Sequence, residues 1–326
     1  MKIAALLPHV EVFGGVRRYI EIGSELVKRG HDFVLYHPEG NVPDWLAFRG
    51  VTRPFASLGD EQFDIGLCSE YSILDQFEQI PARAKYFYFI LEGHRKEKDV
   101  VQRNYFFLGN SEGICRRMER KYKIRCIKAA GGVNPEIFHP VQDRPPRDTL
   151  NILCYGRIYK RRKGIRYVLR AVDGLSKEFP QLRLILFDTP VGQDRRDPRP
   201  MIKTRIPHDF YLDLPQDRMA WLFSQADIFV SAELRAGWSN TSAEAMACGV
   251  PVVCTPSGTR DFAFHNETAL VVSWAWPVLL RRQIRRLIVD DVLRRRLAQA
   301  GHRKIREFTW AALSDRLVAI FKSAQN

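Results

Sequence analysis

Two basic residues that follow a short apolar run are well suited to binding a phosphate. Residues 151–155 read as a buried strand, and Arg157 and Lys163 come directly after it. A planar guanidinium and an ammonium at the carboxyl end of a parallel strand suit a diphosphate. Basic loops of this kind are common, so the pair alone is a moderate signal. A further basic residue, Arg162, directly precedes Lys163.

A second stretch, residues 233–255, places small polar residues between two apolar runs. The runs 226–231 and 250–254 read as neighbouring strands. Between them we expect a loop and then a helix that starts at Ala243 and ends at Gly249. Unpaired N–H groups and the helix dipole attract an anion to such a helix start. The loop residues that would approach the ligand are Gly237, Trp238, Ser239, Asn240, Thr241 and Ser242.

Glu244 falls in the first turn of this expected helix. Its carboxylate could accept hydrogen bonds from a vicinal diol such as a ribose. The residues alone leave a second interpretation equally open. In that interpretation Glu244 stabilises the helix start through the dipole, which is worth a few tenths to about 1 kcal/mol.

Strand and helix signals alternate along the whole chain, with glycines at many of the turns. Among them we expect a helix at 17–29, a strand at 267–272, and Ser111 as the N-cap of the helix that runs to Arg120. This alternation predicts an α/β chain with parallel sheets. A polar, proline-bearing stretch at 141–148 reads as a linker. At 326 residues the chain fits two domains of ordinary size better than one.

The composition is that of a globular protein, with an apolar fraction of 45%. No apolar run approaches the roughly 20 residues that a membrane-spanning helix needs. The apolar stretch at 3–7 is too short for a signal peptide. Six cysteines without close CxxC pairs are most simply reduced core residues. We therefore expect a cytoplasmic protein.

The formal charge of +14 is spread unevenly. Residues 1–150 hold 22 Lys and Arg against 20 Asp and Glu, whereas residues 151–326 hold 29 against 17. A basic half attracts the phosphates of a nucleotide, a nucleic acid or an anionic bilayer. For the arginine clusters at 281–286 and 294–296, an ordinary solvated helix face is an equally good interpretation.

These motifs, taken together and in order, resemble the retaining glycosyltransferases of family 4. The most specific block is 244–253, Glu-Ala-Met-Ala-Cys-Gly-Val-Pro-Val-Val. The resemblance spans essentially the full chain. Its other parts are Gly14-Gly15, Gly30-His31, Gly131-Gly132-Val133-Asn134, Gly156-Arg157, Lys163-Gly164, residues 225–230 and Phe308-Thr309-Trp310.

The resemblance implies the GT-B fold, with two Rossmann-like parallel-sheet domains that face each other across a cleft. Residues 1–143 would form an acceptor domain and residues 149–308 the nucleotide-sugar donor domain. The C-terminal helix, about 309–326, would pack back on the first domain. The implied activity is metal-independent transfer of a sugar from a nucleoside-diphosphate sugar, without a cofactor. The acceptor would be a hydroxyl of a glycan, a glycolipid or a small molecule.

The resemblance also assigns roles to individual residues. Arg157 and Lys163 would bind the donor diphosphate, and Glu244 the donor ribose. The spacing from Arg157 to Lys163 is one residue longer than is usual in the family, so Arg162 competes with Lys163 for its role. Residues 237–243 would hold the sugar and phosphate through main-chain N–H groups. At the first domain, Gly14, Gly15 and Arg17 would let the acceptor or a donor phosphate approach closely. His94 stands where the family often has a histidine near the donor sugar, although an exposed loop histidine remains the alternative.

One departure from the family pattern concerns the donor sugar. Family members usually carry a glutamate eight positions before the second one, in a pair written E-x7-E. Here that position is Ala236, and the nearest carboxylate upstream is Glu233. The usual contact to the sugar hydroxyls, and with it the identity of the donor sugar, is therefore in doubt.

Several other functions compete with sugar transfer. A nucleotide-sugar epimerase or a phosphorylase would share the fold but carry its own catalytic residues, which we do not find. A non-catalytic nucleotide-sugar-binding protein is the second alternative. We do not expect nucleic-acid binding, because the arginine clusters at 281–296 lack interleaved aromatic residues. Those clusters could instead contact an anionic membrane at the inner face of the plasma membrane. The sequence leaves the oligomeric state open.

Overall fold

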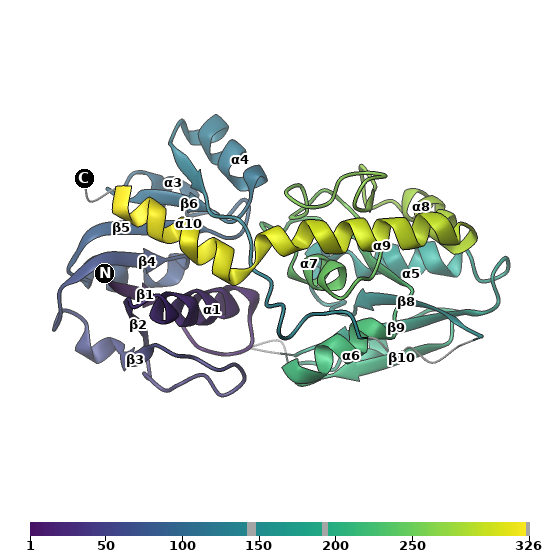
Figure 1. Cartoon of the computed structure of the whole chain (residues 1–326), viewed down its shortest axis with the longest axis horizontal. Coiled ribbons are helices and arrows are strands. Elements are labelled where there is room, and N and C mark those ends of the chain that lie inside the picture. The colour runs from purple at the N-terminus through teal and green to yellow at the C-terminus, as the bar shows by residue number, and fades with distance from the viewer. Residues whose placement is uncertain (142–147, 191–194, 324–326) are drawn as a thin grey trace. The chain divides into compact units, whose positions relative to one another are not determined.

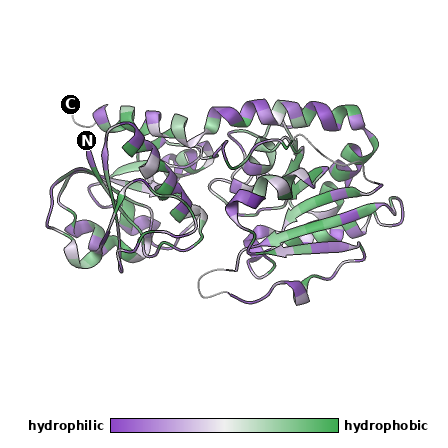
Figure 2. Ribbon diagram, turned by 60° about the horizontal axis from the view of Figure 1, so that its bottom comes forward, coloured by the Kyte–Doolittle hydropathy of each residue, from purple (hydrophilic) through white to green (hydrophobic). Residues whose placement is uncertain are grey.

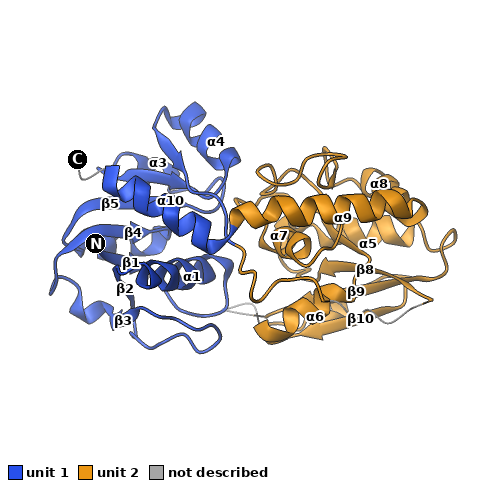
Figure 3. Cartoon of the chain, in the orientation of Figure 1, with its two compact units in different colours: residues 1–132, 309–326 blue, residues 133–308 orange. Residues whose placement is uncertain are grey.

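The computed structural model describes residues 1–141, 148–190 and 195–323. The chain divides into two compact units (Figure 3). The first comprises Met1–Gly132 and Thr309–Asn326, and the second Val133–Phe308. The linker predicted at 141–148 lies mostly outside the described residues.

A seven-stranded parallel sheet forms the centre of the first unit (Figure 1). Its strands lie in the order β3-β2-β1-β4-β5-β6-β7. They are β1 (Lys2–Leu6), β2 (Asp32–His37), β3 (Val51–Pro54), β4 (Phe63–Cys68), β5 (Ala82–Phe89), β6 (Phe106–Gly109) and β7 (Cys126–Lys128). The helices of this unit are α1 (Gly14–Lys28), α2 (Leu74–Gln79), α3 (Glu97–Val101), α4 (Glu112–Tyr122) and α10 (Trp310–Ser323).

Helices cover both faces of this sheet, which explains the unbroken apolar run of β1. Ile3 and Ala5 point into one hydrophobic cluster, and Ala4 and Leu6 into the other. The first cluster also contains Trp310, Leu313, Leu317 and Phe321 of α10. The C-terminal helix therefore packs on the first unit, beside α1.

The second unit contains a six-stranded parallel sheet in the order β10-β9-β8-β11-β12-β13. Figure 2 shows hydrophobic residues along its central strands. The strands are β8 (Leu150–Tyr155), β9 (Leu182–Asp188), β10 (His208–Leu212), β11 (Ile228–Ser231), β12 (Val252–Cys254) and β13 (Leu270–Val271). The helices are α5 (Ile165–Asp173), α6 (Met219–Ser224), α7 (Asn240–Ala247), α8 (Pro277–Val289) and α9 (Asp291–Ile305).

Most of the elements read from the sequence occur, but several boundaries differ. Strand β3 was not predicted, because its residues are exposed or half-buried and give no apolar signal. Helix α1 begins at Gly14 rather than at Arg17. The strand expected at 267–272 is only two residues long. Ser111 caps α4 as predicted, since its side chain accepts a hydrogen bond from the N–H of Ile114.

Candidate functional site

The candidate site lies at the carboxyl ends of β8 and β11, which are neighbouring strands. The order of the strands reverses at this pair. Strands β9 and β10 lie on the outer side of β8, and strands β12 and β13 lie on the outer side of β11. Ligands of open parallel sheets bind at such a reversal, because the loops that follow the two strands leave a crevice there. The loop after β8 carries Arg157 and Lys163, and the loop after β11 carries residues 232–239.

Backbone contacts hold these two loops together. The N–H of Leu234 donates to the carbonyl oxygen of Arg162 at 2.8 Å. The guanidinium of Arg162 in turn lies 3.5 Å from the carbonyl oxygen of Arg235. Gly164 has a φ of +69°, and a Cβ at this position would lie 1.9 Å from the carbonyl oxygen of Ala232. Only glycine permits both this φ and this close approach.

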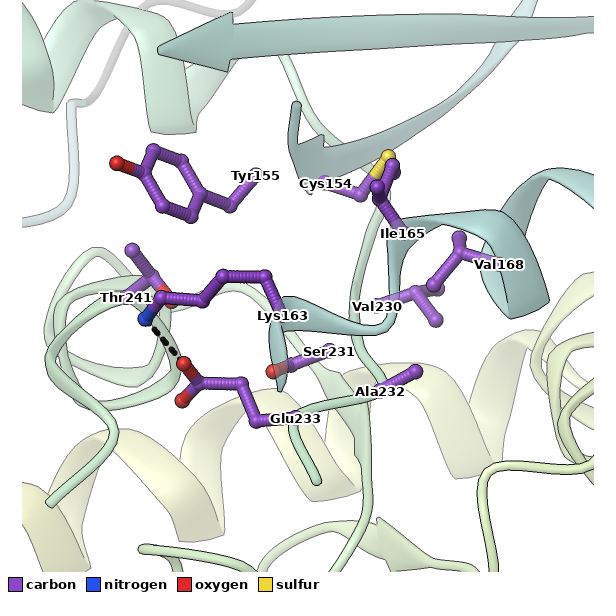
Figure 4. A pocket seen from close by; sticks show the side chains of 10 residues that line it. All are labelled: Cys154, Tyr155, Lys163, Ile165, Val168, Val230, Ser231, Ala232, Glu233 and Thr241. Atoms are coloured by element: carbon purple, nitrogen blue, oxygen red, sulfur yellow. Dashed lines mark hydrogen bonds and ion pairs between the residues drawn. The ribbon is translucent and has the colours of Figure 1, made fainter. Parts of the chain in front are cut away.

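A buried ion pair joins the two loops inside a small pocket (Figure 4). The ammonium of Lys163 donates to Oε1 of Glu233. The side chain of Glu233 is 4% exposed and that of Lys163 is 19% exposed. The second carboxylate oxygen of Glu233 is buried and has no hydrogen-bond partner within the described residues. Ser231 and Thr241 line the same pocket.

Tyr155, a residue that the sequence analysis did not single out, contacts both predicted phosphate-binding cations. The Lys163 ammonium lies 5.3 Å from the centre of its ring. Nη1 of Arg157 lies 3.3 Å from its hydroxyl oxygen and donates to the carbonyl oxygen of Thr189 at 3.1 Å. The same guanidinium nitrogen lies 3.7 Å from Asp188, whose carboxyl pKa is raised by burial. Tyr155 thus contacts Arg157 through its hydroxyl and Lys163 through its ring.

Helix α7 begins at Asn240, three residues before the start expected from the sequence. Asn240, Thr241 and Ser242 therefore form its first turn and not the end of a loop. Ser239 occupies the N-cap position, and its hydroxyl donates to that of Ser242 at 2.9 Å. The weak helix preference of these polar residues is overridden by their surroundings. In the part of the chain that the structure describes, the three N–H groups of this turn have no hydrogen-bond acceptor.

The earlier start of α7 moves Glu244 from the expected first turn into the second. Its side chain is buried, with 8% of the residue exposed. The effect of the helix dipole falls off within the first turn. Stabilisation of the helix start is therefore a weaker explanation for the presence of Glu244 than it was in the sequence. A hydrogen-bonding role for Glu244 remains a prediction.

Two other residues of the expected loop are engaged in the protein itself. The Trp238 ring packs on Phe262 and Phe308, with ring centres 4.8 and 5.4 Å apart, and the residue is 7% exposed. The N–H of Ser239 donates to the carbonyl oxygen of Gly258 at 2.8 Å. Of the six residues 237–242, the first turn of α7 is therefore the part best placed to offer main-chain N–H groups.

Ala236, the position where a glutamate was expected, is 4% exposed. Its N–H donates to the hydroxyl of Ser257 at 2.8 Å. The carboxylate that enters the pocket comes instead from Glu233, three residues earlier. The sequence did signal this residue as the nearest upstream carboxylate, but its pairing with Lys163 depends on the meeting of two loops that are distant in sequence.

In the first unit, the glycines after β1 lie at the start of α1. Helix α1 begins at Gly14, and a Cβ on Gly15 would lie 3.0 Å from the Ile90 side chain. Arg17 is 9% exposed, and its guanidinium lies 5.7 Å from the centre of the Trp45 ring. The backbone at Gly15 is thus closely packed, while Arg17 is largely buried rather than extended into solvent.

His94 lies in a turn after β5 that a buried carboxylate organises. Glu97, which is 1% exposed, accepts hydrogen bonds from the backbone N–H groups of Gly93 and His94 and two more from the Arg117 guanidinium. The His94 ring stacks on Tyr71 with ring centres 3.9 Å apart. Burial, followed by the charge of Arg95, lowers the pKa of His94. The lowered pKa favours the neutral form of this half-buried imidazole.

Glu70, at the carboxyl end of β4, was missed by the sequence analysis. Burial raises the pKa of its carboxyl to about 7. A Cβ on Gly15 would lie 3.8 Å from its Oε1, so the carboxyl lies beside the start of α1. A carboxylate directly after an apolar strand was the available signal. Perturbed carboxyl groups at strand ends are frequent in functional sites.

Across 1–141, 148–190 and 195–323, no three His, Cys, Asp or Glu side chains are grouped so that they could hold a metal ion. Within the same residues, no helix is long and apolar enough to cross a membrane.

Comparison with known proteins places the candidate site within a recognised domain. Residues 149–290 match the model of the family Glycosyl transferases group 1. A D-inositol 3-phosphate glycosyltransferase of Corynebacterium diphtheriae is 26% identical over 213 residues. That match covers 60% of this chain and 50% of the relative. The chain thus spans about half the length of this curated relative.

Two solved structures resemble the chain over nearly its full length. Sucrose-phosphate synthase from Thermosynechococcus elongatus superposes with a TM-score of 0.81 at 18% identity, covering 99% of this chain and 98% of that one. HepE from Anabaena, solved with UDP and glucose, gives a TM-score of 0.74 at 14% identity, covering 99% and 100%. The predicted α/β fold of GT-B type, with two Rossmann-like parallel-sheet domains, is confirmed.

Proposed function

We propose that this chain is a retaining glycosyltransferase, which moves a sugar from a nucleoside-diphosphate sugar to an acceptor hydroxyl. One observation carries the proposal. Arg157, Lys163 and the first turn of α7 converge between β8 and β11, where the strand order of the sheet reverses. Two cations beside unpaired helix N–H groups suit a diphosphate. The group 1 domain at residues 149–290 supports the same assignment.

Departure of the sugar leaves a growing negative charge on the diphosphate. We assign the stabilisation of that charge to Arg157, to Lys163 or its neighbour Arg162, and to the N–H groups at the start of α7. Removing one such donor typically costs roughly 3–4 kcal/mol of transition-state stabilisation. With these groups in place the proposed reaction needs no bound metal and no cofactor.

Glu244 would accept hydrogen bonds from the ribose hydroxyls of the donor. The main chain of residues 237–242 would hold the sugar and phosphate, chiefly through the first turn of α7. The sugar–phosphate bond would break before the acceptor oxygen attacks from the same face, and an oxygen of the leaving diphosphate would take up the proton of the acceptor hydroxyl. The sugar would pass through an ion pair with the diphosphate, and its anomeric configuration would be retained.

The acceptor side of the proposal rests on the first unit. Gly14, Gly15 and Arg17 would bind the acceptor or a donor phosphate, and His94 would act near the donor sugar. The acceptor would be a glycan, a lipid-linked molecule or a small molecule. All six cysteines are buried thiols outside any disulfide, which supports a cytoplasmic location. Contact with the inner face of the plasma membrane would be peripheral.

Product analysis tests this proposal directly. The purified chain is incubated with nucleotide sugars labelled in the sugar, with candidate acceptors, and with or without a chelator. We expect the label to move to the acceptor with retained anomeric configuration, which NMR reads, and the chelator to have no effect. An epimerase would leave the label on the nucleotide. A sensor would bind the nucleotide sugar without turnover.

A further inference from the structure

Two tryptophans of the second unit project into solvent immediately before helix α8. Trp274 is 66% exposed and Trp276 is 62% exposed, whereas Ala275 between them is 5% exposed. Both indoles therefore lie on the outer side of this segment, and Ala275 lies on its inner side. The other four tryptophans of the chain are buried or half-buried. An exposed indole pair on a well-packed segment is therefore unusual within this protein.

Helix α8 continues the same outer surface. Its inner side is formed by Leu280, Ile284 and Leu287, each 0% exposed and part of the core of the second unit. Its outer side carries Val278, which is 61% exposed, and the exposed arginines Arg281, Arg282 and Arg285. Spacings of three and four residues place these side chains on one face of the helix.

The arginines of this face differ in how their charge is balanced. Arg285 donates to Glu178 of the segment after α5 at 2.7 Å. Arg281 and Arg282 form no ion pair with any of the described residues. Two uncompensated positive charges therefore lie within about two turns of the exposed tryptophans.

We propose that Trp274, Trp276, Val278, Arg281 and Arg282 form a docking surface for an anionic lipid bilayer. Indoles partition to the headgroup level of a membrane, where an amphipathic ring has both an apolar and a wet side. The arginines add attraction to anionic headgroups, of about fivefold in affinity per charge. This surface gives a location to the peripheral contact included in the proposed function, but its binding to lipid does not depend on sugar transfer.

The composition of the surface favours a bilayer over other partners. A neutral glycan could stack on the indoles but would leave the two arginine charges without a counterpart. A single-stranded nucleic acid is bound by aromatic residues interleaved with basic ones. Here both tryptophans lie at one end and the arginines follow them. Aromatic and apolar groups beside unpaired arginines match the layered chemistry of a headgroup region.

Flotation of the full chain with vesicles tests the assignment. Vesicles of phosphatidylcholine alone and of phosphatidylcholine with phosphatidylglycerol are compared at low and at physiological salt. We expect co-flotation only with the anionic vesicles, and more at low salt. Trp274→Ala/Trp276→Ala should abolish it, and Arg281→Ala/Arg282→Ala should weaken it by about 25-fold. Arg295→Ala/Arg296→Ala, which removes the same charge from exposed positions on α9, is the matched control.

Melting temperature and nucleotide binding of each variant show whether it is folded. Quenching of tryptophan emission by brominated lipids in the unaltered chain gives a second readout that needs no variant. Absence of co-flotation at low salt, or co-flotation that survives the double tryptophan variant, overturns the assignment. Tryptophan-dependent self-association, or binding to glycan or single-stranded DNA without binding to vesicles, would assign the surface to another partner. Each of these results is separable from sugar transfer, which is measured without vesicles.

Discussion

At the scale of single residues, the site presents a cation whose charge is already balanced. Lys163 would bind a diphosphate, yet its ammonium is paired with Glu233 in a pocket with little solvent. Bringing two such charges out of water costs several kcal/mol, and their attraction offsets this only when the geometry is good. An incoming diphosphate must therefore share or replace Glu233 as the partner of Lys163.

A double-mutant cycle on Lys163→Met and Glu233→Gln measures how strongly the pair is coupled. Each single change leaves one member of the pair without its partner in a buried pocket, so each should destabilise the fold by roughly 1–3 kcal/mol. The double variant should recover part of this loss, with a coupling free energy above about 0.5 kcal/mol. Denaturant unfolding of the four proteins gives the value.

The exposed pair Arg183–Asp209 is the matched control for this cycle. Its side chains are 39% and 42% exposed, so its coupling should not exceed a few tenths of a kcal/mol. Equal coupling in the two pairs would show that burial adds nothing at Lys163–Glu233.

Glu70 predicts a pH-dependent stability of the first unit. Burial raises the pKa of this carboxyl from 4.5 to about 7 in the folded chain. Between these values the folded state holds a proton that the unfolded state has lost, so this contribution is fully present below pH 4.5 and is lost as the pH rises to about 7. Glu70→Gln should therefore gain stability relative to the unaltered chain over this window, by up to about 3 kcal/mol.

Melting temperatures of the two proteins at pH 5, 6, 7 and 8 check the Glu70 prediction. The difference should increase up to pH 7 and then level off. Glu267→Gln removes an exposed carboxyl and should show no such trend. A constant difference between Glu70→Gln and the unaltered chain across this range would contradict the prediction.

Residue types and spacing identified Arg157, Lys163 and Glu244 as candidates, because cations after a strand and a carboxylate in a short helix are visible in the sequence. Tyr155 and Glu233 could not be selected in the same way. The role of Glu233 comes from its contact with Lys163, which lies 70 residues away in the loop after β8. The role of Tyr155 depends on how that loop folds back over its ring. Periodicity along one segment does not encode such contacts.

At the scale of elements, Gly164 sets the distance between the loop after β8 and the end of β11. Its φ of +69° is one that other residues rarely adopt, and a Cβ would collide with the backbone of Ala232. A backbone carbonyl cannot move aside as a flexible side chain can. The loop that carries Lys163 therefore depends on this glycine.

Gly164→Ala should shift this loop and destabilise the second unit by more than 2 kcal/mol, because a steric clash adds to the roughly 1–2 kcal/mol cost of the left-handed conformation. Gly30→Ala is the matched control. Gly30 has a φ of +77° but nothing within 4 Å of an added Cβ, so only the conformational cost should appear. Thermal unfolding of both variants distinguishes the two, and similar losses would contradict a role for close packing at Gly164.

Element boundaries were the least predictable part of the fold. Helix α7 starts within a polar segment, because contacts of Ser239 with Ser242 and Gly258 outweigh the low helix preference of Asn, Thr and Ser. Strand β3 has no apolar pattern, since an edge strand with exposed residues does not need one. The buried central strands, by contrast, were recognisable as continuous apolar runs.

At the scale of the whole molecule, two similar sheets contribute different candidate sites. The second unit holds the cations and the helix start that suit a diphosphate, and the first holds Gly15, Glu70 and His94 at its own strand ends. The family resemblance predicts the same division, with the donor bound by the second unit and the acceptor by the first. The nature of the donor and of the acceptor depends on side-chain detail that differs among proteins of this fold.

The proposed function depends on the binding of a nucleoside diphosphate by the second unit through Arg157 and Lys163. The most direct test is thermal unfolding of the chain with a panel of nucleoside diphosphates and nucleotide sugars, since a ligand of the native state raises its melting temperature. We predict that at least one of them stabilises the unaltered chain and the control Arg183→Ala. Arg157→Ala and Lys163→Ala should remain folded but respond little. Equal stabilisation of all four proteins, or of none, would contradict the binding of a nucleoside diphosphate through Arg157 and Lys163.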